Sequence, residues 1–135
     1  MANAAQEEYL RAFYYLQQKN GVARSSALAA YLGISKAGVS GMLRKLSSRG
    51  LLVVSPYSPA RLTRRGMLLA RKMTFKHRVL ELFLSNKLGM EASAVHEEAS
   101  RLEHAASDET VRRIYNMLGR PRQDPHGQPI VKVEA

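Results

Sequence analysis

The chain has 135 residues, of which 45% are hydrophobic, and it carries a formal net charge of +10 and no cysteine. A chain of this length and composition can pack one domain, or two small units that share a core. The lack of cysteine excludes disulfides and thiolate metal sites, and no apolar run approaches the roughly 20 residues of a membrane helix. We therefore expect a cytoplasmic protein with no membrane partner.

The positive charge is concentrated in the first part of the chain. Residues 9–80 contain 14 Lys and Arg and no Asp or Glu, whereas residues 81–135 contain 7 basic and 9 acidic residues. A solvated surface can carry such charge, but so long a stretch of one sign favours a polyanionic partner. Because the stretch lacks one long basic amphipathic helix, nucleic acid is favoured over a membrane surface.

Three helices are predicted before residue 50: Gln6–Gln18, Ala27–Leu32 and Ser35–Arg49. We expect Ser25 or Ser26 to cap the second helix, Gly33 to make the turn, and Ser35 to cap the third. A short helix, a glycine turn and a longer capped helix are typical of a helix-turn-helix, although a plain helical hairpin has the same elements.

The outward face of the third helix carries hydroxyl, amine and guanidinium groups, which suit phosphate oxygens and base edges. Gly38 and Gly41 each cost about 1 kcal/mol relative to Ala in a helix. They indicate either close approach to a surface such as the groove floor or loose packing. The predicted DNA-binding residues lie on this helix, with one on the wing described next: Ser35, Lys36, Ala37, Gly38, Ser40, Arg44 and Arg61.

A small hairpin is predicted after the third helix. Leu51–Val54 is a strand candidate, Ser55–Ala60 is a turn with two prolines, and Arg61–Thr63 returns. Two short strands after a recognition helix make a winged helix. Arg61 is then placed to meet the DNA backbone or a groove.

Four helices are predicted after the wing: Thr63–Met73, Phe75–Leu88, Ser93–Ala106 and Ser107–Gly119. Phe75–Leu88 has more apolar surface than one amphipathic face needs, and the surplus predicts a partner subunit. In the last helix we expect Ile114, Met117 and Leu118 to face inward. Gly119–Ala135 contains three of the five prolines and is predicted to be an extended tail.

Candidate metal ligands occur on three of these helices: Glu8, His77, Glu81, His96, Ser100, Glu103 and His104. The last four share one side of a helix, and such a stripe can hold a divalent ion or be a solvated polar face. Ser100 stands where H-E-x-x-H would need its second histidine, which excludes that zinc protease motif. Carboxylates and imidazoles suit Mn²⁺ and Fe²⁺ and give no soft preference for copper or zinc.

Four segments carry the most specific patterns: E-E-Y-L-R-A-F-Y at Glu7–Tyr14, L-T-R-R-G at Leu62–Gly66, K-H-R at Lys76–Arg78 and V-H-E-E-A-S-R-L-E-H-A-A-S-D-E at Val95–Glu109. Together they resemble the metal-dependent repressors of the diphtheria toxin repressor and manganese transport regulator type, over about Glu7–Ile130. Gly127–Ile130 resembles the segment that precedes an SH3-like domain in longer members. We expect a short form without that domain.

The resemblance implies a winged helix-turn-helix DNA-binding domain over residues 1–73, a helical metal-binding and dimerisation domain over 74–119, and a tail over 120–135. It also implies two metal sites in each subunit. One would use Glu8, Glu103, His104 and the Ser100 position, and the other would use His77, Glu81 and His96. Ser100 departs from the family's Cys or Glu, and Arg11 stands where manganese-type members have a second carboxylate.

The expected protein is a mainly α, homodimeric, Mn²⁺- or Fe²⁺-activated regulator that binds double-stranded operator DNA, with Mn²⁺ favoured because Glu8 is a hard ligand. The resemblance implies repression of metal-uptake genes. The alternative is a winged-helix regulator that responds to a small organic ligand or to none. A metal-dependent hydrolase lacks a recognisable catalytic set here, so no enzyme is expected, and a chromatin-type DNA binder would show affinity without sequence preference.

Overall fold

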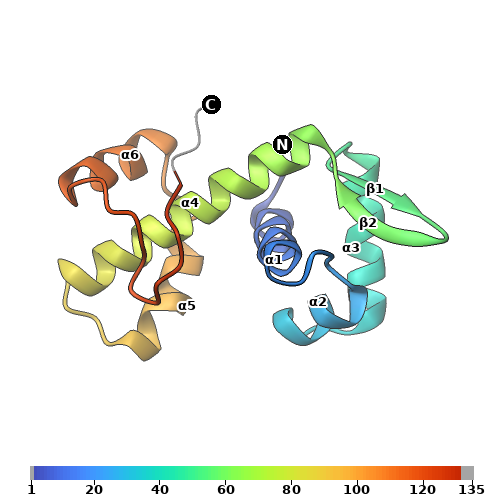
Figure 1. Ribbon diagram of the computed structural model, residues 1–135, viewed down its shortest axis with the longest axis horizontal. Coiled ribbons are helices and arrows are strands. Elements are labelled where there is room, and N and C mark those ends of the chain that lie inside the picture. Colours follow the sequence, from blue (N-terminus) through green and yellow to red (C-terminus); the bar gives the residue numbers. More distant parts are fainter. Residues whose placement is uncertain (1, 132–135) are drawn as a thin grey trace. The chain divides into compact units, whose positions relative to one another are not determined.

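The computed structural model describes residues 2–131, and its elements follow the order of a winged helix with a helical second half. Within that range the chain forms these elements (Figure 1): α1 Ala4–Asn20, α2 Ser25–Leu32, α3 Lys36–Ser48, β1 Leu52–Ser55, β2 Ser58–Leu62, α4 Arg64–Asn86, α5 Ala92–Leu102 and α6 Asp108–Met117. The predicted mainly α class with a winged helix-turn-helix is confirmed. The backbone divides into two compact units, with the boundary between Arg71 and Lys72 inside α4.

The first unit is built around α1. Its buried side chains follow the helical repeat and include Tyr9, Leu10, Phe13 and Leu16. A capping box starts the helix, because the Asn3 side chain accepts from the Gln6 N–H at 2.9 Å and the Gln6 side chain accepts from the Asn3 N–H at 3.1 Å. Gly21 ends the helix in the left-handed conformation, with a φ of 83°. The core of this unit continues onto α2, α3 and β1 through Leu28, Val39, Leu46, Leu51 and Leu52.

The caps of α2 and α3 differ from each other. Ser35 caps α3 as predicted, with its hydroxyl oxygen 3.0 Å from the Gly38 N–H that donates to it. The prediction that Ser25 or Ser26 caps α2 was wrong. The extended backbone of a cap position falls on Arg24, whose side chain makes no capping bond in the described chain, so both serines already lie in the first turn.

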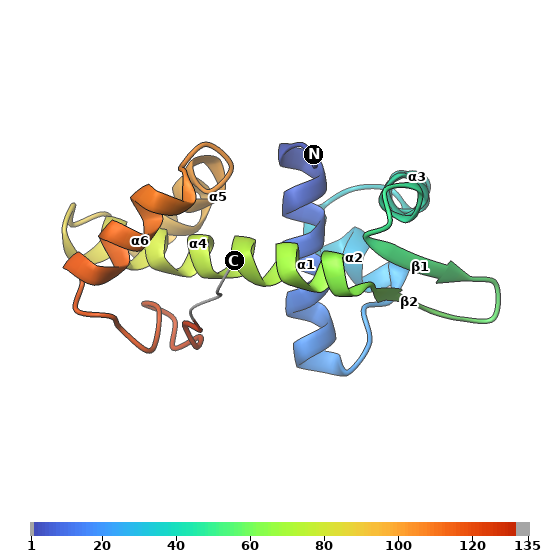
Figure 2. The same ribbon diagram turned by 90° about the horizontal axis from the view of Figure 1, so that it is seen from above.

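The wing is an antiparallel hairpin in which Leu52 pairs with Leu62 and a register shift falls between Val53 and Ser55. Both strands reach further toward the tip than predicted, β1 to Ser55 and β2 from Ser58, so the turn is shorter than the expected Ser55–Ala60. The hairpin projects away from the helices of its unit (Figure 2). Its tip residue Tyr57 is 99% exposed.

Hydrogen bonds of Thr63 connect the end of the wing to the start of α4. Thr63 Oγ1 accepts from the Gly66 N–H at 3.0 Å and donates to the Gly50 carbonyl at 2.7 Å, so Thr63 caps the helix as predicted. The Thr63 N–H donates to the Leu51 carbonyl at 3.2 Å. A Cβ on Gly66 would lie 1.9 Å from that same Leu51 oxygen. Only glycine therefore lets α4 begin this close to β1.

The predicted break between Met73 and Phe75 was wrong, since α4 is one helix from Arg64 to Asn86. No proline occurs within it, and its single glycine, Gly66, lies in the first turn. Thr74 is buried within it, and one β-branched residue lowers helix propensity only slightly.

In the second unit α4 packs on two sides. Phe75, Val79 and Leu82 form one cluster with Val111 and Tyr115 of α6, and Leu80 and Leu84 form another with α5. These two clusters absorb most of the apolar surplus of α4, so that surplus does not by itself require a partner subunit. Leu88, just past the end of α4, stays 59% exposed, and Met117 of α6, predicted to face inward, is 54% exposed.

The C-terminal segment is not the extended tail that was predicted. It turns back on itself through an isolated bridge between Gln123 and Pro129, and Ile130 is buried in the cluster with Phe75 and Val79. Arg78 of α4 donates to the Pro129 carbonyl at 2.6 Å. Residues 132–135 of the predicted tail lie outside the described range. Among the described residues, no helix has the length and hydropathy of a membrane span.

Candidate metal centre and nucleic-acid interface

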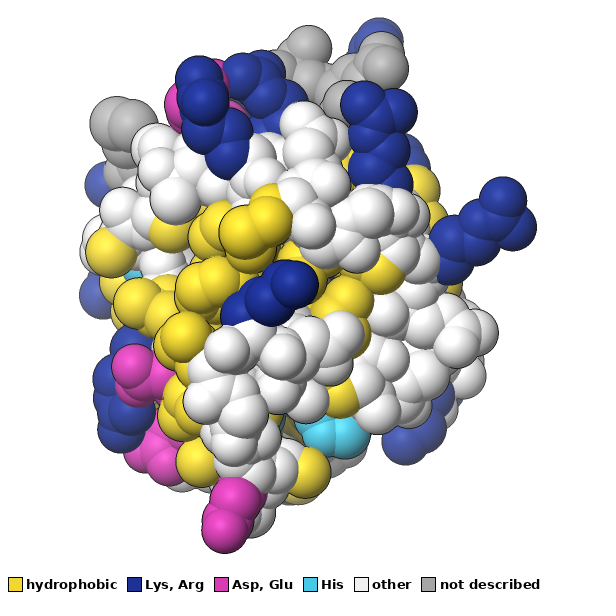
Figure 3. All heavy atoms as spheres, turned by 90° about the vertical axis from the view of Figure 1, so that its left-hand side faces the viewer, with side chains coloured by type: hydrophobic (Ala, Val, Ile, Leu, Met, Phe, Trp, Pro, Cys, Tyr) yellow, Lys and Arg dark blue, Asp and Glu magenta, His cyan; other side chains and the backbone are white. Residues whose placement is uncertain are grey.

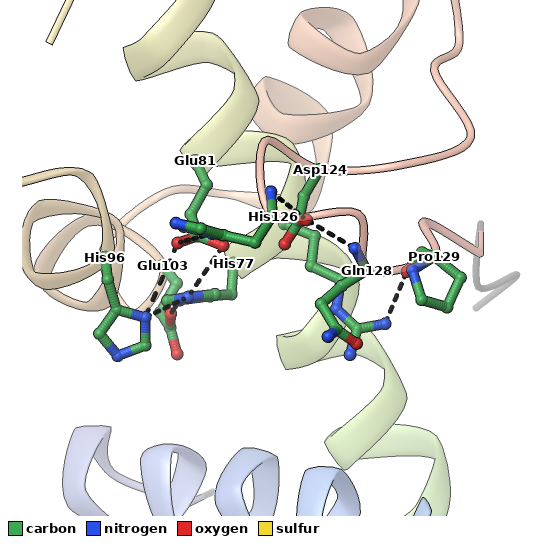
Figure 4. A network of polar contacts seen from close by, with 9 residues as sticks. His77, Glu81, His96, Glu103, Asp124, His126, Gln128 and Pro129 are labelled. Atoms are coloured by element: carbon green, nitrogen blue, oxygen red, sulfur yellow. Dashed lines mark hydrogen bonds and ion pairs between the residues drawn. The ribbon is translucent and has the colours of Figure 1, made fainter. Parts of the chain in front are cut away.

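The second unit gathers four of the predicted ligands into one buried cluster (Figure 4). His77 and Glu81 lie one turn apart on α4 and therefore share a face. His96 comes from α5, and Glu103 follows the last residue of that helix. His77, Glu81 and Glu103 are each at most 5% exposed, whereas the side chain of His96 is 54% exposed.

Glu81 is the centre of this cluster. Its Oε1 is 3.4 Å from His77 Nε2, and its Oε2 is 3.7 Å from His96 Nδ1. His77 Nε2 is also 3.1 Å from His96 Nδ1, and the two rings meet edge to face. His77, Glu81 and His96 thus each offer one ligand atom within 4.8 Å of the other two.

Glu103 extends the cluster toward His104. Its Oε1 is 2.5 Å from His77 Nδ1, which is a short hydrogen bond, and its Oε2 is 3.7 Å from His104 Nε2. Glu103 is completely buried. The resemblance implied that Glu103 and His77 belong to different metal sites, and in the structure the two side chains are hydrogen-bonded.

The buried carboxylates perturb one another. Burial alone would raise the pKa of Glu81, but the neighbouring imidazoles of His77 and His96 outweigh it and hold that pKa well below its usual range. Burial, together with the adjacent Glu81 carboxylate, raises the pKa of Asp124 above its usual range. Negative charge is therefore concentrated on Glu81, between the imidazoles.

Two residues near Glu81 were missed from the sequence. Asp124 and His126 belong to the C-terminal segment, and with Glu81 they form a second group of ligand atoms within 4.8 Å of one another. His126 Nδ1 lies 3.6 Å from Glu81 Oε2. The signal was present as D-P-H-G-Q-P, an aspartate and a histidine in a turn-forming stretch. An extended tail gave no reason to bring that stretch to α4.

The remaining predicted ligands are placed on their own elements. Glu8 lies half-buried on α1 in the first unit, and Ser100 lies half-buried on α5. The combination of Glu8, Ser100, Glu103 and His104 into one metal site stays a prediction.

The predicted DNA-binding residues are all solvent-exposed. Six of them cluster at and after the start of α3 and the seventh lies on β2: Ser35, Lys36, Ala37, Gly38, Ser40, Arg44 and Arg61. A Cβ on Gly38 would come within 3.3 Å of the Ser35 hydroxyl that caps the helix. Gly41 has only the end of the Arg44 side chain near it, 4.0 Å away. Packing within the chain therefore explains Gly38 in part and does not explain Gly41.

Comparison with known proteins places this chain in a family. The sequence pattern of the iron dependent repressor N-terminal DNA binding domain matches residues 1–60, and that of the iron dependent repressor metal binding and dimerisation domain matches residues 63–132. The chain belongs to the iron dependent repressor family. Both patterns describe repressors rather than enzymes.

Relatives in this family cover most of the chain. The diphtheria toxin repressor of Corynebacterium glutamicum is 36% identical over 124 residues, which are 92% of this chain and 54% of that protein. An uncharacterised HTH-type transcriptional regulator of Methanocaldococcus jannaschii is 35% identical over 109 residues, or 80% of this chain and 87% of the relative. The chain thus spans about half the length of the curated diphtheria toxin repressors that it matches.

A solved structure of a manganese-dependent transcriptional repressor in complex with manganese is also similar. It is 38% identical, has a TM-score of 0.85, and its likeness covers 94% of this chain and 58% of that one.

The residues present here fit a divalent cation. The cluster offers imidazole nitrogens and carboxylate oxygens and no sulfur, which suits Mn²⁺ or Fe²⁺. Glu81 Oε2 is buried and makes no hydrogen bond to any residue of the described chain. A buried carboxylate oxygen without a hydrogen bond is costly unless a positive charge compensates it.

Proposed function

We propose that this chain is a divalent-metal-activated DNA-binding transcriptional regulator, a repressor that Mn²⁺ or Fe²⁺ switches on. The observation that carries the proposal is the buried cluster of His77, Glu81 and Glu103, in the unit that follows a basic winged helix. A regulator that needed no metal would have no use for so many buried titratable groups around one carboxylate.

The DNA-binding half of the proposal rests on charge and exposure. Lys36, Arg44 and Arg61 are exposed on α3 and β2, and no acidic residue occurs from Tyr9 to Leu80 to oppose them. Lys and Arg bind phosphates and release counterions, while Ser40 and Arg44 can hydrogen-bond base edges in the major groove. Two copies related by a two-fold axis would place their α3 helices about one helical turn of DNA apart.

For metal binding, we propose a role for each of the side chains in the cluster. When bound, the cation supplies positive charge that compensates the buried carboxylates. His77, Glu81 and His96 would hold one ion, and Glu8, Glu103 and His104, with the Ser100 position, would hold another. Glu103 accepts a hydrogen bond from His77, so it also orients that ring toward Glu81. Mn²⁺ is favoured over Fe²⁺ because the acid Glu8 is a hard ligand, and the manganese complex of a similar repressor supports the same choice.

A homodimer in the cytoplasm is part of the same proposal. Figure 3 looks onto the second unit and shows apolar side chains gathered across that face. Leu88 and Met117, each more than half exposed, are surface apolar residues of this unit. The matched family domain is one of dimerisation as well as metal binding. Exposed apolar groups of this kind lower the free energy of a complex when a second copy covers them.

The alternative is a winged-helix regulator that responds to a small organic ligand or to none. To distinguish this alternative from a metal-activated regulator, a DNA sequence is first selected from a random pool with the full chain in MnCl₂. The affinity of the chain for the selected sequence is then measured with and without chelator. We expect Mn²⁺ to tighten binding at least fivefold, the lower end of the usual range for coupling between two sites. Equal affinity in chelator would reject metal activation, and equal affinity for random DNA would indicate a chromatin-type binder instead.

A further inference from the structure

Lys76 is a buried lysine on α4, directly before the candidate ligand His77. It is 8% exposed, and lysines are rarely buried unless they are paired. Its Nζ donates to the Ala106 carbonyl at 2.7 Å and lies 2.9 Å from Asp108 Oδ1. Ala106 belongs to the α5–α6 turn, residues 103–107, and Asp108 is the first residue of α6. Lys76 therefore connects α4 to this turn and to the helix that follows it.

The α5–α6 turn also carries two candidate metal ligands. Glu103 and His104 are its first residues, directly after the end of α5. The backbone of the turn is compact, because the Ala106 N–H donates to the Leu102 carbonyl at 2.9 Å. The two ligands and the carbonyl that Lys76 binds therefore lie on one short piece of hydrogen-bonded backbone.

Two consecutive residues of α4 hold this turn at two points. His77 Nδ1 lies 2.5 Å from Glu103 Oε1 at the start of the turn, a contact that Figure 4 shows. Lys76 binds the Ala106 carbonyl near the end of the turn. A turn held at both ends keeps the direction in which its side chains project, and ligands that are oriented in advance bind an ion more tightly.

Lys72 lies one helical turn before Lys76 on α4 and binds the same carboxylate. Its Nζ is 2.8 Å from Asp108 Oδ2, and its side chain is 36% exposed, against 10% for Lys76. Each lysine therefore brings one positive charge to Asp108. Within residues 2–131, the hydrogen bond to the Ala106 carbonyl comes from Lys76. The pair thus separates the effect of charge from the effect of holding the turn.

We propose that Lys76 is a positioning residue for the metal site of Glu103 and His104, and that it acts by fixing the turn that carries them. The inference rests on the proposed function, because it concerns how one of the two metal sites named there is held ready for its ion. An ammonium group has no lone pair for a metal, so Lys76 acts through the ligands. Its contribution is the freedom that these ligands no longer have to lose when the ion binds.

Charge and positioning predict opposite effects when this lysine is removed. Lys76→Met keeps a side chain of similar length and removes the charge and the donor. If charge alone mattered, the loss of a positive group next to His77 would strengthen the binding of a cation. If Lys76 positions the turn, Lys76→Met should weaken one Mn²⁺ site by about tenfold or more, because groups that orient a metal ligand contribute about 10- to 100-fold.

Titration calorimetry of the full chain with MnCl₂ measures this change. Lys72→Met is the matched control, because it removes the same charge from the same carboxylate and leaves the bond of Lys76 to the turn in place. The control should bind Mn²⁺ at least as tightly as the wild type. Thermal unfolding of the metal-free variants checks that each is folded, and Lys76→Gln replaces Lys76→Met if the methionine variant is not.

A double-mutant cycle distinguishes positioning from a general loss of structure. Lys76→Met is combined with Glu103→Gln, which changes one of the ligands on the turn. If Lys76 acts through this ligand, the double variant should lose less Mn²⁺ affinity than the product of the two single losses, because coupled residues are not additive. A general loosening of the fold would instead multiply the two losses.

The outcomes separate this inference from the proposed function. A Mn²⁺ affinity in Lys76→Met that equals or exceeds that of the wild type would overturn the inference and leave the proposed function in place. An equal loss in Lys72→Met, or losses that multiply in the double variant, would do the same. A wild type that binds no Mn²⁺ at all would overturn both.

Discussion

Glu103→Gln is the substitution that tests the buried cluster most sharply. Glu103 has no exposed surface, and its two oxygens face different imidazoles, His77 at 2.5 Å and His104 at 3.7 Å. Glutamine has nearly the same shape and removes the negative charge. Its carbonyl oxygen can still accept a hydrogen bond from His77, so the fold should survive.

Glu103→Gln should lower both the stability of the metal-free chain and its affinity for Mn²⁺. In the metal-free chain the hydrogen bond changes from a charged acceptor to a neutral one, which should lower the free energy of unfolding by about 1 to 1.5 kcal/mol. The Mn²⁺ affinity should fall by at least 10- to 100-fold, about 1.4 to 2.7 kcal/mol, because a carboxylate ligand is lost and His77 is less firmly oriented. The larger effect is therefore on metal binding.

Calorimetric titration with Mn²⁺ and thermal unfolding of the metal-free protein measure the two effects separately. Glu97→Gln is the matched control, since that side chain lies on α5, is 76% exposed and pairs with Arg101 of the same helix. Unchanged Mn²⁺ affinity in Glu103→Gln would refute the assignment of Glu103 as a ligand. Equal weakening in the control would show that net charge, rather than coordination, sets the affinity.

Three further predictions concern the wing, the DNA-binding face and a surface ion pair. Gly66→Ala should destabilise the first unit by about 1 to 3 kcal/mol in chemical denaturation, because a Cβ would collide with the Leu51 carbonyl, and a variant as stable as the wild type would disprove that contact. Arg44→Ala should weaken DNA binding and lower the slope of log affinity against log salt by about 1 without changing Mn²⁺ affinity; an unchanged slope would place Arg44 away from phosphates. Hydrogen bonds from Lys72 and a second lysine of α4 hold the pKa of Asp108 below its usual 3.8, so this carboxylate stabilises the fold above that pH and the contribution is lost as the pH falls through the lowered pKa. Asp108→Asn should therefore cost less than about 1 kcal/mol at pH 7, since the side chain is 56% exposed, and the cost should shrink as the pH falls below 3.8; a cost that grows in acid would contradict the ion pair.

The sequence predicted the elements well where capping residues and glycines mark their ends. Ser35, Thr63 and Ser107 cap their helices as side-chain acceptors, because a hydroxyl followed by a periodic apolar run is a local signal. The break expected near Thr74 was wrong because helix continuation there depends on burial in the core, which a local pattern does not show.

The candidate site was also predicted only where a local sequence pattern marks it. His77 and Glu81 share a helical face by spacing alone, and His96 was recognised on a second helix. Asp124 and His126 were missed because they reach Glu81 through a turn that tertiary contacts hold, those of Arg78 with Pro129 and of Ile130 with the core. Neither contact is marked in the sequence by a helical or strand repeat of apolar residues.

Metal binding and DNA binding in this protein are expected to be linked by one free energy of coupling. Such coupling must be reciprocal, so the factor by which Mn²⁺ tightens DNA binding must equal the factor by which the selected DNA tightens Mn²⁺ binding. Titrating Mn²⁺ into the full chain with and without that DNA measures the second factor directly. We expect the Mn²⁺ affinity to rise 5- to 150-fold when DNA is present, and an affinity that is the same with and without DNA would contradict the account.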